Sequence, residues 1–405
     1  MSESIKDKVA IVGAGCSMFG ERWDVGFEDM VVEAAYEAYE DAGVEGKDIE
    51  AAWYASTTRA AIGGAGSTTP QTGLGISLPL KLQYKPISHV QNACGSGEDA
   101  MRNAAYALAA KVYDLVLVLG VEKLKDQGYG GLVQMATPPH TVINMGGSGP
   151  GWYALAATRY FHKFGLAPEQ GKRLLAMISS KSHHNGARNP KAHLRREVTV
   201  EQIMAAPIIA WPLGLYDCCG VTDGASALIM CRAEDAKNYR KDYMLIKGLG
   251  LSIGSGMGPV RTDYDYTWWN ETHYAAQDAY KQAGITNPRK QIDLVELHDC
   301  FSIAELIAAE SLSVCERGHA KEDIESGAWT QEGEMPINLS GGLKSFGHPV
   351  GASGAREAYE VYKQLQGKAE DSTRQLKTKP TTGVVHNQGG APGKFMCAVC
   401  VYGLP

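Results

Sequence analysis

Residues 90–106 read Val-Gln-Asn-Ala-Cys-Gly-Ser-Gly-Glu-Asp-Ala-Met-Arg-Asn-Ala-Ala-Tyr, and they carry the chain from a glycine-containing turn into a helix. Residues 351–362, Gly-Ala-Ser-Gly-Ala-Arg-Glu-Ala-Tyr-Glu-Val-Tyr, open a second helix in the same way. Ser96-Gly97 of the first stretch then matches Ser353-Gly354 of the second. Two such helix starts, one in each half of the chain, predict a duplicated α/β unit with its site at the junction between the halves.

Apolar runs typical of buried strands alternate with amphipathic runs typical of helices. The predicted strands are Val9–Val12, Leu115–Leu119, Met244–Ile246, Leu294–Leu297 and Val384–Val385, and the predicted helices are Phe27–Gly43, Met101–Ala110, Glu271–Gly284 and Ser302–Gly318. This alternation indicates a sheet buried between helical layers. We expect an N-terminal half (1–121 with 218–240), a C-terminal half (241–405) and a loop or cap excursion over the site (122–217), which is rich in glycine between 127 and 151.

Composition and charge exclude several classes of protein. The chain has 405 residues, of which 44% are hydrophobic, and 39 basic against 45 acidic side chains give a net charge of −6. Such a composition excludes disordered, coiled-coil and collagen-like proteins. The acidic balance argues against nucleic acid as the main partner, because no basic field exists to release counterions. We find neither a signal peptide nor an apolar run long enough to span a bilayer, and we expect a cytoplasmic protein without a membrane partner.

Two motifs suggest cofactor or metal sites that their spacing does not support. Gly13-Ala14-Gly15 follows a strand, but a dinucleotide fingerprint needs a third glycine where Met18 stands and a helix that begins at once. Cys397 and Cys400 have zinc-like spacing, yet they lack a second pair and lie in an apolar, strand-like stretch. The nine scattered cysteines suit reduced thiols. We therefore expect core thiols at these positions and no metal.

Cys94 stands at the strand-to-helix turn of the first repeat. A thiol there faces the exposed N–H groups and positive dipole end of the helix, which favour the thiolate. Free N–H donors beside it would suit a developing oxyanion. In the second half, Gly347-His348-Pro349 forms a constrained turn that could aim an imidazole inward to take the proton of Cys94. Taken singly, each residue has a structural alternative, since such cysteines and turn histidines more often serve the fold.

Further polar residues stand at the ends of predicted strands. His298, Asp299 and Cys300 end the strand at 294–297, and residues 386–390, His-Asn-Gln-Gly-Gly, follow the strand at 384–385. Sites in open α/β sheets gather at the carboxyl ends of strands, so these clusters are expected to meet Cys94. A metal site is the alternative, although no pair of these residues has tight ligand spacing within one element.

Together these motifs resemble the thiolase family and are most similar to its sterol-carrier-protein-type branch. The resemblance runs through nearly the whole chain, including Asn189-Pro190 and residues 216–225. It implies the thiolase fold, an α/β architecture in which two duplicated βαβ-type halves form a layered α-β-α-β-α core. It also implies that Cys94 is the nucleophile that takes the acyl group as a thioester, and that His348 activates it.

The same resemblance implies roles for the strand-end residues. Cys300 would be the acid/base that handles the α-carbon proton, and His298 would take the part that an asparagine plays in common thiolases. Gly389 would complete the oxyanion hole beside the nucleophile, with Asn387 and His386 next to it. The run 388–392 departs from the Gly-x-Gly-Gly run usual in this branch, so the assignment of this loop is less specific.

The implied reaction is the CoA-dependent Claisen cleavage of a 3-oxoacyl-CoA, as in beta-oxidation, with coenzyme A as a substrate and no covalently bound cofactor. CoA phosphates need cations, and the basic stretch 181–196 resembles the CoA-loop region of the family. A solvated loop is the alternative for each cation there. The candidates are Arg188, Lys191, Arg195 and Arg196.

The family implies a homodimer core, and some relatives work with a small zinc-ribbon/OB-fold subunit. The chain is also similar to the large subunit of benzoylsuccinyl-CoA thiolase, which would imply a bulky aromatic or branched substrate. The alternatives are another thiolase-fold condensing or acyl-transfer enzyme, or a non-catalytic subunit of a thiolase complex. Cys300 and the Gly-His-Pro turn favour a thiolase, because the condensing synthases rely on histidines instead of an acid/base cysteine.

Overall fold

The computed structural model describes residues 4–57, 73–127 and 148–405. Most of the glycine-rich run between 127 and 151 therefore lies outside the described residues. Among the helices of the described part, none is long and apolar enough to cross a membrane.

The described strands form one large sheet and one small hairpin. They are β1 (Val9–Cys16), β2 (Ala51–Ala55), β3 (Ile87–Val90), β4 (Leu115–Glu122), β5 (Ile208–Ala210), β6 (Leu213–Gly214), β7 (Gly224–Arg232), β8 (Met244–Ile253), β9 (Leu294–Leu297), β10 (Thr382–Gly389) and β11 (Met396–Gly403). Within the described residues nine of them form a mixed sheet in the order β3-β2-β4-β7-β1-β8-β11-β10-β9, and β5 pairs with β6. The antiparallel pairs Ala10–Leu245 and Ile11–Met244 join the strands of the two halves.

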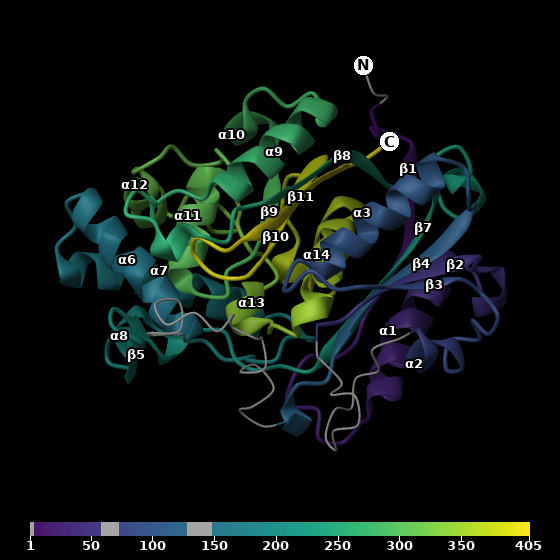
Figure 1. The fold of residues 1–405 in the computed structure, drawn as a ribbon, viewed down its shortest axis with the longest axis horizontal. Helices are drawn as coiled ribbons and strands as arrows, with labels where there is room; N and C mark the ends of the chain where they lie inside the picture. Colours follow the sequence, from purple (N-terminus) through teal and green to yellow (C-terminus); the bar gives the residue numbers. More distant parts are fainter. Residues whose placement is uncertain (1–3, 58–72, 128–147) are drawn as a thin grey trace.

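The helices lie in layers on both sides of these strands. They are α1 (Phe27–Ala42), α2 (Leu74–Ser77), α3 (Ser96–Ala109), α6 (Gly149–Lys163), α7 (Pro168–Ala187), α8 (Val200–Met204), α9 (Asn270–Ala283), α10 (Pro288–Gln291), α11 (Ser302–Ser311), α12 (Ala320–Glu325), α13 (Gly342–Ser345) and α14 (Ser353–Gln366). Figure 1 shows α3 and α14 in the middle of the molecule, where they contact each other and both halves of the sheet. Helix α1 covers β1 and β7 on one outer face, and α9 covers β8 and β11 on the other. This arrangement confirms the α-β-α-β-α layering.

The Gly13-Ala14-Gly15 motif serves helix packing. Strand β1 continues through it to Cys16, and α1 begins only at Phe27. A Cβ atom on Gly13 would lie 2.4 Å from the carbonyl oxygen of Ala38, and one on Gly15 would lie 2.1 Å from that of Ala34. The two glycines therefore let the backbone of α1 approach β1, which is a structural reason for the motif.

The two repeated helices meet at their N-terminal ends. A Cβ atom on Gly354 would lie 2.6 Å from the backbone nitrogen of Glu98, and one on Gly97 would lie 3.0 Å from that of Ala355. Glycine at both matched positions therefore lets the first turns of α3 and α14 pack directly against each other. The chain segments just before these turns, which carry Cys94 and His348, are thereby brought to one place.

The structure differs from the sequence expectations in three places. The described part of the 122–217 excursion is mostly helical, because α6, α7 and α8 occupy it. Helix α11 ends at Ser311 rather than at Gly318, since Ser313 adopts a left-handed backbone with φ of 59° and the chain turns there. Strand β10 pairs with β11 as far as Gly389, so the run that begins at His386 lies inside a strand instead of following one.

Candidate active site

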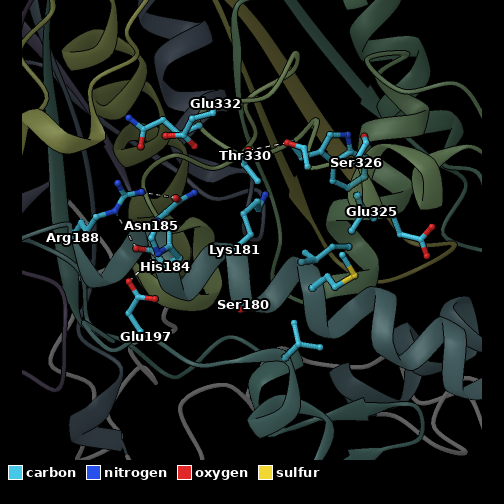
Figure 2. A pocket seen from close by; sticks show the side chains of 17 residues that line it. Ser180, Lys181, His184, Asn185, Arg188, Glu197, Glu325, Ser326, Thr330 and Glu332 are labelled. Carbon is cyan, nitrogen blue, oxygen red and sulfur yellow. Dashed lines mark hydrogen bonds and ion pairs between the residues drawn. The ribbon is translucent and has the colours of Figure 1, made fainter.

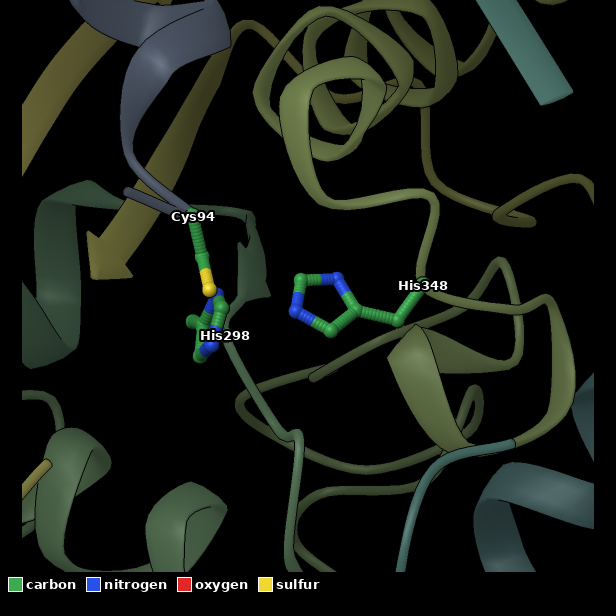
Figure 3. Close-up of side chains that lie close together, drawn as sticks. All are labelled: Cys94, His298 and His348. Carbon is green, nitrogen blue, oxygen red and sulfur yellow. The ribbon is translucent and has the colours of Figure 1, made fainter. Parts of the chain in front are cut away.

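Cys94, His298 and His348 form a buried cluster at the junction of the two halves. Their ligand atoms all lie within 4.8 Å of one another. Figure 3 shows the three side chains converging from three segments: the β3–α3 turn, the end of β9 and the loop before α14. The structure thus brings together three residues that lie up to 254 positions apart in the sequence (348 − 94).

The turn that carries Cys94 is fixed by local hydrogen bonds. Ala93 has a left-handed backbone with φ of 49°, which reverses the chain just before the cysteine. The hydroxyl of Ser96 donates to the carbonyl of Ala93 (2.5 Å) and accepts from the backbone N–H of Asn92 (2.7 Å). Cys94 is thereby held two residues before the first residue of α3, where the helix dipole favours negative charge.

Burial opposes ionisation of the Cys94 thiol while the site is empty. It raises the pKa of Cys94 to about 12, although a hydrogen bond from the backbone N–H of Gly390 lowers that pKa in part. A thiol in such surroundings needs a base to become a nucleophile. The expected oxyanion residue Gly389 lies against the same turn, since a Cβ atom there would be 2.7 Å from the Cys94 nitrogen. The amide that reaches the sulfur belongs to its neighbour Gly390.

His348 has the tautomer that a base requires. Its Nδ1 lies 2.7 Å from the hydroxyl of Ser353, and that hydroxyl donates its single hydrogen to the carbonyl of Pro349 (3.2 Å). Nδ1 must therefore carry the donated hydrogen, which leaves Nε2 with a free lone pair. Figure 3 shows the imidazole directed toward Cys94 and His298. Burial lowers the pKa of His348 to about 4, which keeps the ring neutral near pH 7.

His298 has the opposite tautomer. The side-chain N–H of Asn387 lies 3.4 Å from Nδ1 of His298, and as a donor it leaves the ring hydrogen on Nε2. The rings of His298 and His348 meet edge to face with centroids 5.0 Å apart. Burial, reinforced by the charges of His348 and His386, lowers the pKa of His298 well below its ordinary value. His298 is therefore a neutral N–H donor beside the neutral acceptor His348.

Cys300 lies close to Cys94, two residues after His298. It is buried, and its charge would interact with those of Cys219 and Cys94. Burial raises its pKa well above that of an ordinary thiol, while a hydrogen bond from Tyr153 lowers it in part. The segments around the two cysteines are also linked, because the backbone N–H of Cys219 donates to the carbonyl of Cys300 (2.9 Å).

Asp299 connects the end of β9 to the loop that carries His348. Its carboxylate accepts from the ammonium group of Lys344 (2.9 Å), and both side chains are fully buried. It also accepts from the backbone N–H of Leu343 (2.5 Å). This pair anchors the loop next to His298 and Cys300. His386 lies behind the site, where its backbone carbonyl accepts from the N–H of His298 (2.9 Å) and its Nε2 lies 3.1 Å from the hydroxyl of Thr272.

The cations expected to contact CoA lie in different surroundings. Arg188 lines a cavity of about 460 Å³ between α7 and residues 324–332, which Cys94, His298, His348 and Cys300 do not line (Figure 2). Its guanidinium donates to the carbonyl oxygens of His184 and Thr373 and to the side chain of Asn185. Arg188 is therefore held by its own surroundings.

The other three expected cations divide into one buried and two exposed groups. The ammonium of Lys191 donates to the carbonyl of Cys16 (2.5 Å) and pairs with Glu37 and Glu370. Arg195 and Arg196 are exposed, and neither has an ion pair with any residue of the described ranges. Their guanidinium groups are open to an anionic ligand from solution, whereas Lys191 is committed to the fold.

Several groups of the site carry no motif in the sequence. Tyr153 hydrogen bonds with Cys300, Ser353 sets the tautomer of His348, and Lys344 anchors the loop. Ser353 was visible only as a helix start. The Cys94–His298–His348 cluster would by its spacing and ligand types also suit a zinc ion. Cys397 and Cys400 lie on β11 as predicted, buried in the cores on opposite sides of the sheet.

Comparison with known proteins gives matches along nearly the whole chain. The family model described as thiolase, N-terminal domain matches residues 9–234, and the one described as thiolase C-terminal domain-like matches residues 259–400. An acetyl-CoA acetyltransferase of Methanothermobacter thermautotrophicus is 37% identical over 388 residues, covering 95% of this chain and 97% of that protein. Benzoylsuccinyl-CoA thiolase subunit BbsB of Thauera aromatica is 30% identical over 388 residues, covering 95% and 96%.

The fold is also shared with solved structures. The structure titled Ltp2-ChsH2(DUF35) aldolase superposes with a TM-score of 0.81 at 23% identity, covering 99% of this chain and 98% of that one.

Proposed function

The chain belongs to the thiolase family of acyltransferases, and on this premise we propose that it cleaves a 3-oxoacyl-CoA with coenzyme A by Claisen chemistry. The observation that carries the proposal is the buried meeting of Cys94 with a histidine acceptor and a histidine donor, with Cys300 beside them. A nucleophile, its base, an oxyanion donor and a second acid/base are the four groups that the reaction needs.

In the first half-reaction, Nε2 of His348 takes the proton of Cys94 and the sulfur attacks the 3-keto carbon. The bond between C2 and C3 then breaks, so that the acyl group stays on Cys94 as a thioester and the electron pair leaves as the enolate of a CoA thioester. The enolate oxygen accepts from Nε2–H of His298. Cys300 gives its proton to C2, and acetyl-CoA forms when the leaving unit has two carbons.

In the second half-reaction, free CoA replaces the departed thioester. Its thiol loses a proton to Cys300, which restores that thiol, and the CoA sulfur attacks the carbonyl of the acyl-Cys94. The Cys94 sulfur leaves and recovers its proton from His348. A thiolate suits this exchange, because a thioester passes readily to another thiol. The amide of Gly390 and the positive end of α3 stabilise the sulfur while it carries charge.

We propose acetoacetyl-CoA as the first substrate to test, with support from the 37% identity to an acetyl-CoA acetyltransferase. Benzoylsuccinyl-CoA is the second, with support from the 30% identity to BbsB. Arg195 and Arg196 are proposed to meet the CoA phosphates, since both are exposed and unpaired among the described residues. A homodimer is proposed from the family. A small zinc-ribbon/OB-fold partner is proposed from two names, BbsB being called a subunit and Ltp2 being named together with ChsH2(DUF35).

Intact-mass measurement after mixing the protein with acetoacetyl-CoA tests the proposal. We expect one acetyl adduct on the wild type and on Cys300→Ala, none on Cys94→Ala, and turnover with CoA in the wild type alone. Cys231→Ala is a matched control, because Cys231 is equally buried but lies on β7. An adduct that persists on Cys94→Ala would overturn the nucleophile. Absence of an adduct with both thioesters, also after addition of a DUF35-type subunit, would overturn the thiolase proposal.

A further inference from the structure

We propose that Tyr153 is a positioning residue for Cys300: its hydroxyl, oriented by Gln388, donates a hydrogen bond that stabilises the Cys300 thiolate. This inference rests on the acid/base role that we propose for Cys300. Tyr153 comes from α6, in a part of the chain where the sequence shows no catalytic motif. Gln388 stands where the sequence departs from the glycine run usual in the sterol-carrier-type branch.

A chain of hydrogen bonds determines the direction of the Tyr153 hydroxyl. Nδ1 of His386 accepts from the backbone N–H of His298 (3.4 Å), so the neutral ring carries its hydrogen on Nε2 and donates it to the hydroxyl of Thr272 (3.1 Å). Burial lowers the pKa of His386 to about 3, which keeps this ring neutral. Thr272 then donates its own hydrogen to Oε1 of Gln388 (3.4 Å).

The last links reach Cys300. With Oε1 of Gln388 accepting from Thr272, its amide N–H donates to the oxygen of Tyr153 (3.4 Å). The hydrogen of the Tyr153 hydroxyl is therefore free for its remaining partner, the sulfur of Cys300. Each donor in the chain has one acceptor, so a Tyr153 O–H that points at sulfur satisfies every member.

The ring of Tyr153 is held firmly enough to keep this direction. The side chain is 2% exposed, and its ring centroid lies 4.5 Å from that of Phe301, the residue after Cys300. Trp269 and Phe395 pack around it with centroids 6.2 and 6.3 Å away. The hydroxyl therefore stands at a fixed place beside the thiol.

The charges around Cys300 give this hydrogen bond its importance. The groups that face Cys300 are the thiols of Cys219 and Cys94, the carboxylate of Asp299 and the hydroxyl of Tyr153. The first three oppose a negative sulfur, and burial opposes it most, so the pKa of Cys300 lies well above that of an ordinary thiol. Lys344, the nearest cation that pairs with Asp299, already serves that carboxylate. Tyr153 is the group in this set that favours the thiolate.

Hydrogen–deuterium exchange into the methyl group of acetyl-CoA in D₂O isolates the step that Cys300 performs. The base removes a C2 proton to give the enolate and returns a deuteron, and mass spectrometry of the thioester counts the exchange. We expect Tyr153→Phe to slow exchange by about 10- to 100-fold, the size of one hydrogen bond to a charged group. Its pH–rate profile should move to higher pH, because the thiolate forms less readily, while acetylation of Cys94 stays within about twofold of wild type.

Tyr160→Phe is the matched control. Tyr160 lies on the same helix, and its hydroxyl hydrogen bonds to Glu310 (2.5 Å) at a distance from the cluster. This variant should keep the wild-type exchange profile even if it is less stable. Gln388→Met should shift the profile in the same direction as Tyr153→Phe but by less, and the double variant should be no slower than Tyr153→Phe. Thermal melting shows which variants fold.

The outcomes separate the two proposals. Rapid exchange in Cys300→Ala would overturn the acid/base role of Cys300 and, with it, this inference. Loss of exchange in Cys300→Ala, combined with a folded Tyr153→Phe that has the wild-type profile, would overturn the inference alone. Additive effects of Tyr153→Phe and Gln388→Met would overturn the orienting part of Gln388.

Discussion

The hydroxyl of Ser353 lies 2.7 Å from Nδ1 of His348 and 3.2 Å from the carbonyl oxygen of Pro349. A serine hydroxyl has one hydrogen, and the carbonyl can only accept it, so His348 must be the donor at Nδ1. One residue of α14 thereby fixes which nitrogen of the proposed base is free to take a proton from Cys94. Ser353 is also the first residue of that helix, so the same side chain serves the fold and the site.

Ser353→Ala should lower kcat/KM for thiolysis by about 10- to 100-fold, the usual size for loss of the partner that orients a functional histidine. The His348 ring would then be free to rotate and to change tautomer. Ser353→Thr keeps the hydroxyl and should recover most of the activity. Steady-state kinetics with acetoacetyl-CoA measure both, and an Ala variant with wild-type kcat/KM would contradict this reading of the hydrogen bond.

Gly354→Ala should reduce both activity and stability. The added Cβ would lie 2.6 Å from the backbone nitrogen of Glu98, so α3 and α14 must separate, at a cost of about 1–3 kcal/mol in unfolding free energy. The shift would also move Cys94 and His348 apart. Gly26→Ala is the control, because its Cβ would meet nothing closer than 3.5 Å. Urea unfolding and kcat/KM measure the two effects; equal behaviour of the two variants would show that the helix contact tolerates a methyl group.

The free energy of unfolding should fall as the pH decreases from about 6.5 to about 4, by up to about 1.4 kcal/mol per pH unit for each buried histidine. Burial lowers the pKa of His183 and His348 to about 4 and that of His386 to about 3. In this window the unfolded chain binds more protons than the folded protein, so stability rises with pH. His183→Gln should flatten the dependence by one proton when urea unfolding is followed at several pH values. An unchanged slope would mean that His183 is protonated equally in both states.

Lys191 and Arg195 should respond differently to replacement. Lys191→Met leaves Glu37 and Glu370 without their cation and should lower the unfolding free energy by about 1–3 kcal/mol, with little change in KM for CoA. Arg195→Ala should leave stability within about 0.5 kcal/mol. It should raise KM for CoA by roughly threefold to tenfold, as expected for one charge-assisted contact to phosphate. Melting curves and CoA titrations distinguish the two, and the opposite pattern would exchange their roles.

The cluster of Cys94, His298 and His348 should act without a metal ion. Treatment with EDTA should leave thiolysis unchanged, and elemental analysis should find less than one equivalent of zinc on this chain, because a bound metal would occupy the lone pairs that the proposed reaction uses. Zinc at one equivalent that a chelator removes together with the activity would contradict this prediction. A partner subunit with its own zinc site must be absent from the sample.

Local patterns in the sequence were enough to predict the elements and the main site residues. The apolar strand at Leu294–Leu297 has the predicted bounds, and helix α1 differs by one residue from the predicted helix, because its amphipathic pattern and its terminal glycine act locally. Cys94 and His348 were visible because each stands beside small residues at a helix start. The matched pairs Ser96-Gly97 and Ser353-Gly354 also indicated two related halves.

Only the tertiary structure decided how these residues act. The directions of the hydrogen bonds at His298 and His348 depend on Asn387 and Ser353, whose contacts are set by the packing of β9, β10 and α14. Tyr153 reaches Cys300 across 147 positions (300 − 153), and Lys191 is withdrawn from the solvent by Glu37 across 154. Such distances are closed by burial of apolar layers, and burial is also what shifts the pKa values of the thiols and imidazoles. Sequence periodicity records which faces are buried, but the partner of each polar group depends on how the layers finally pack.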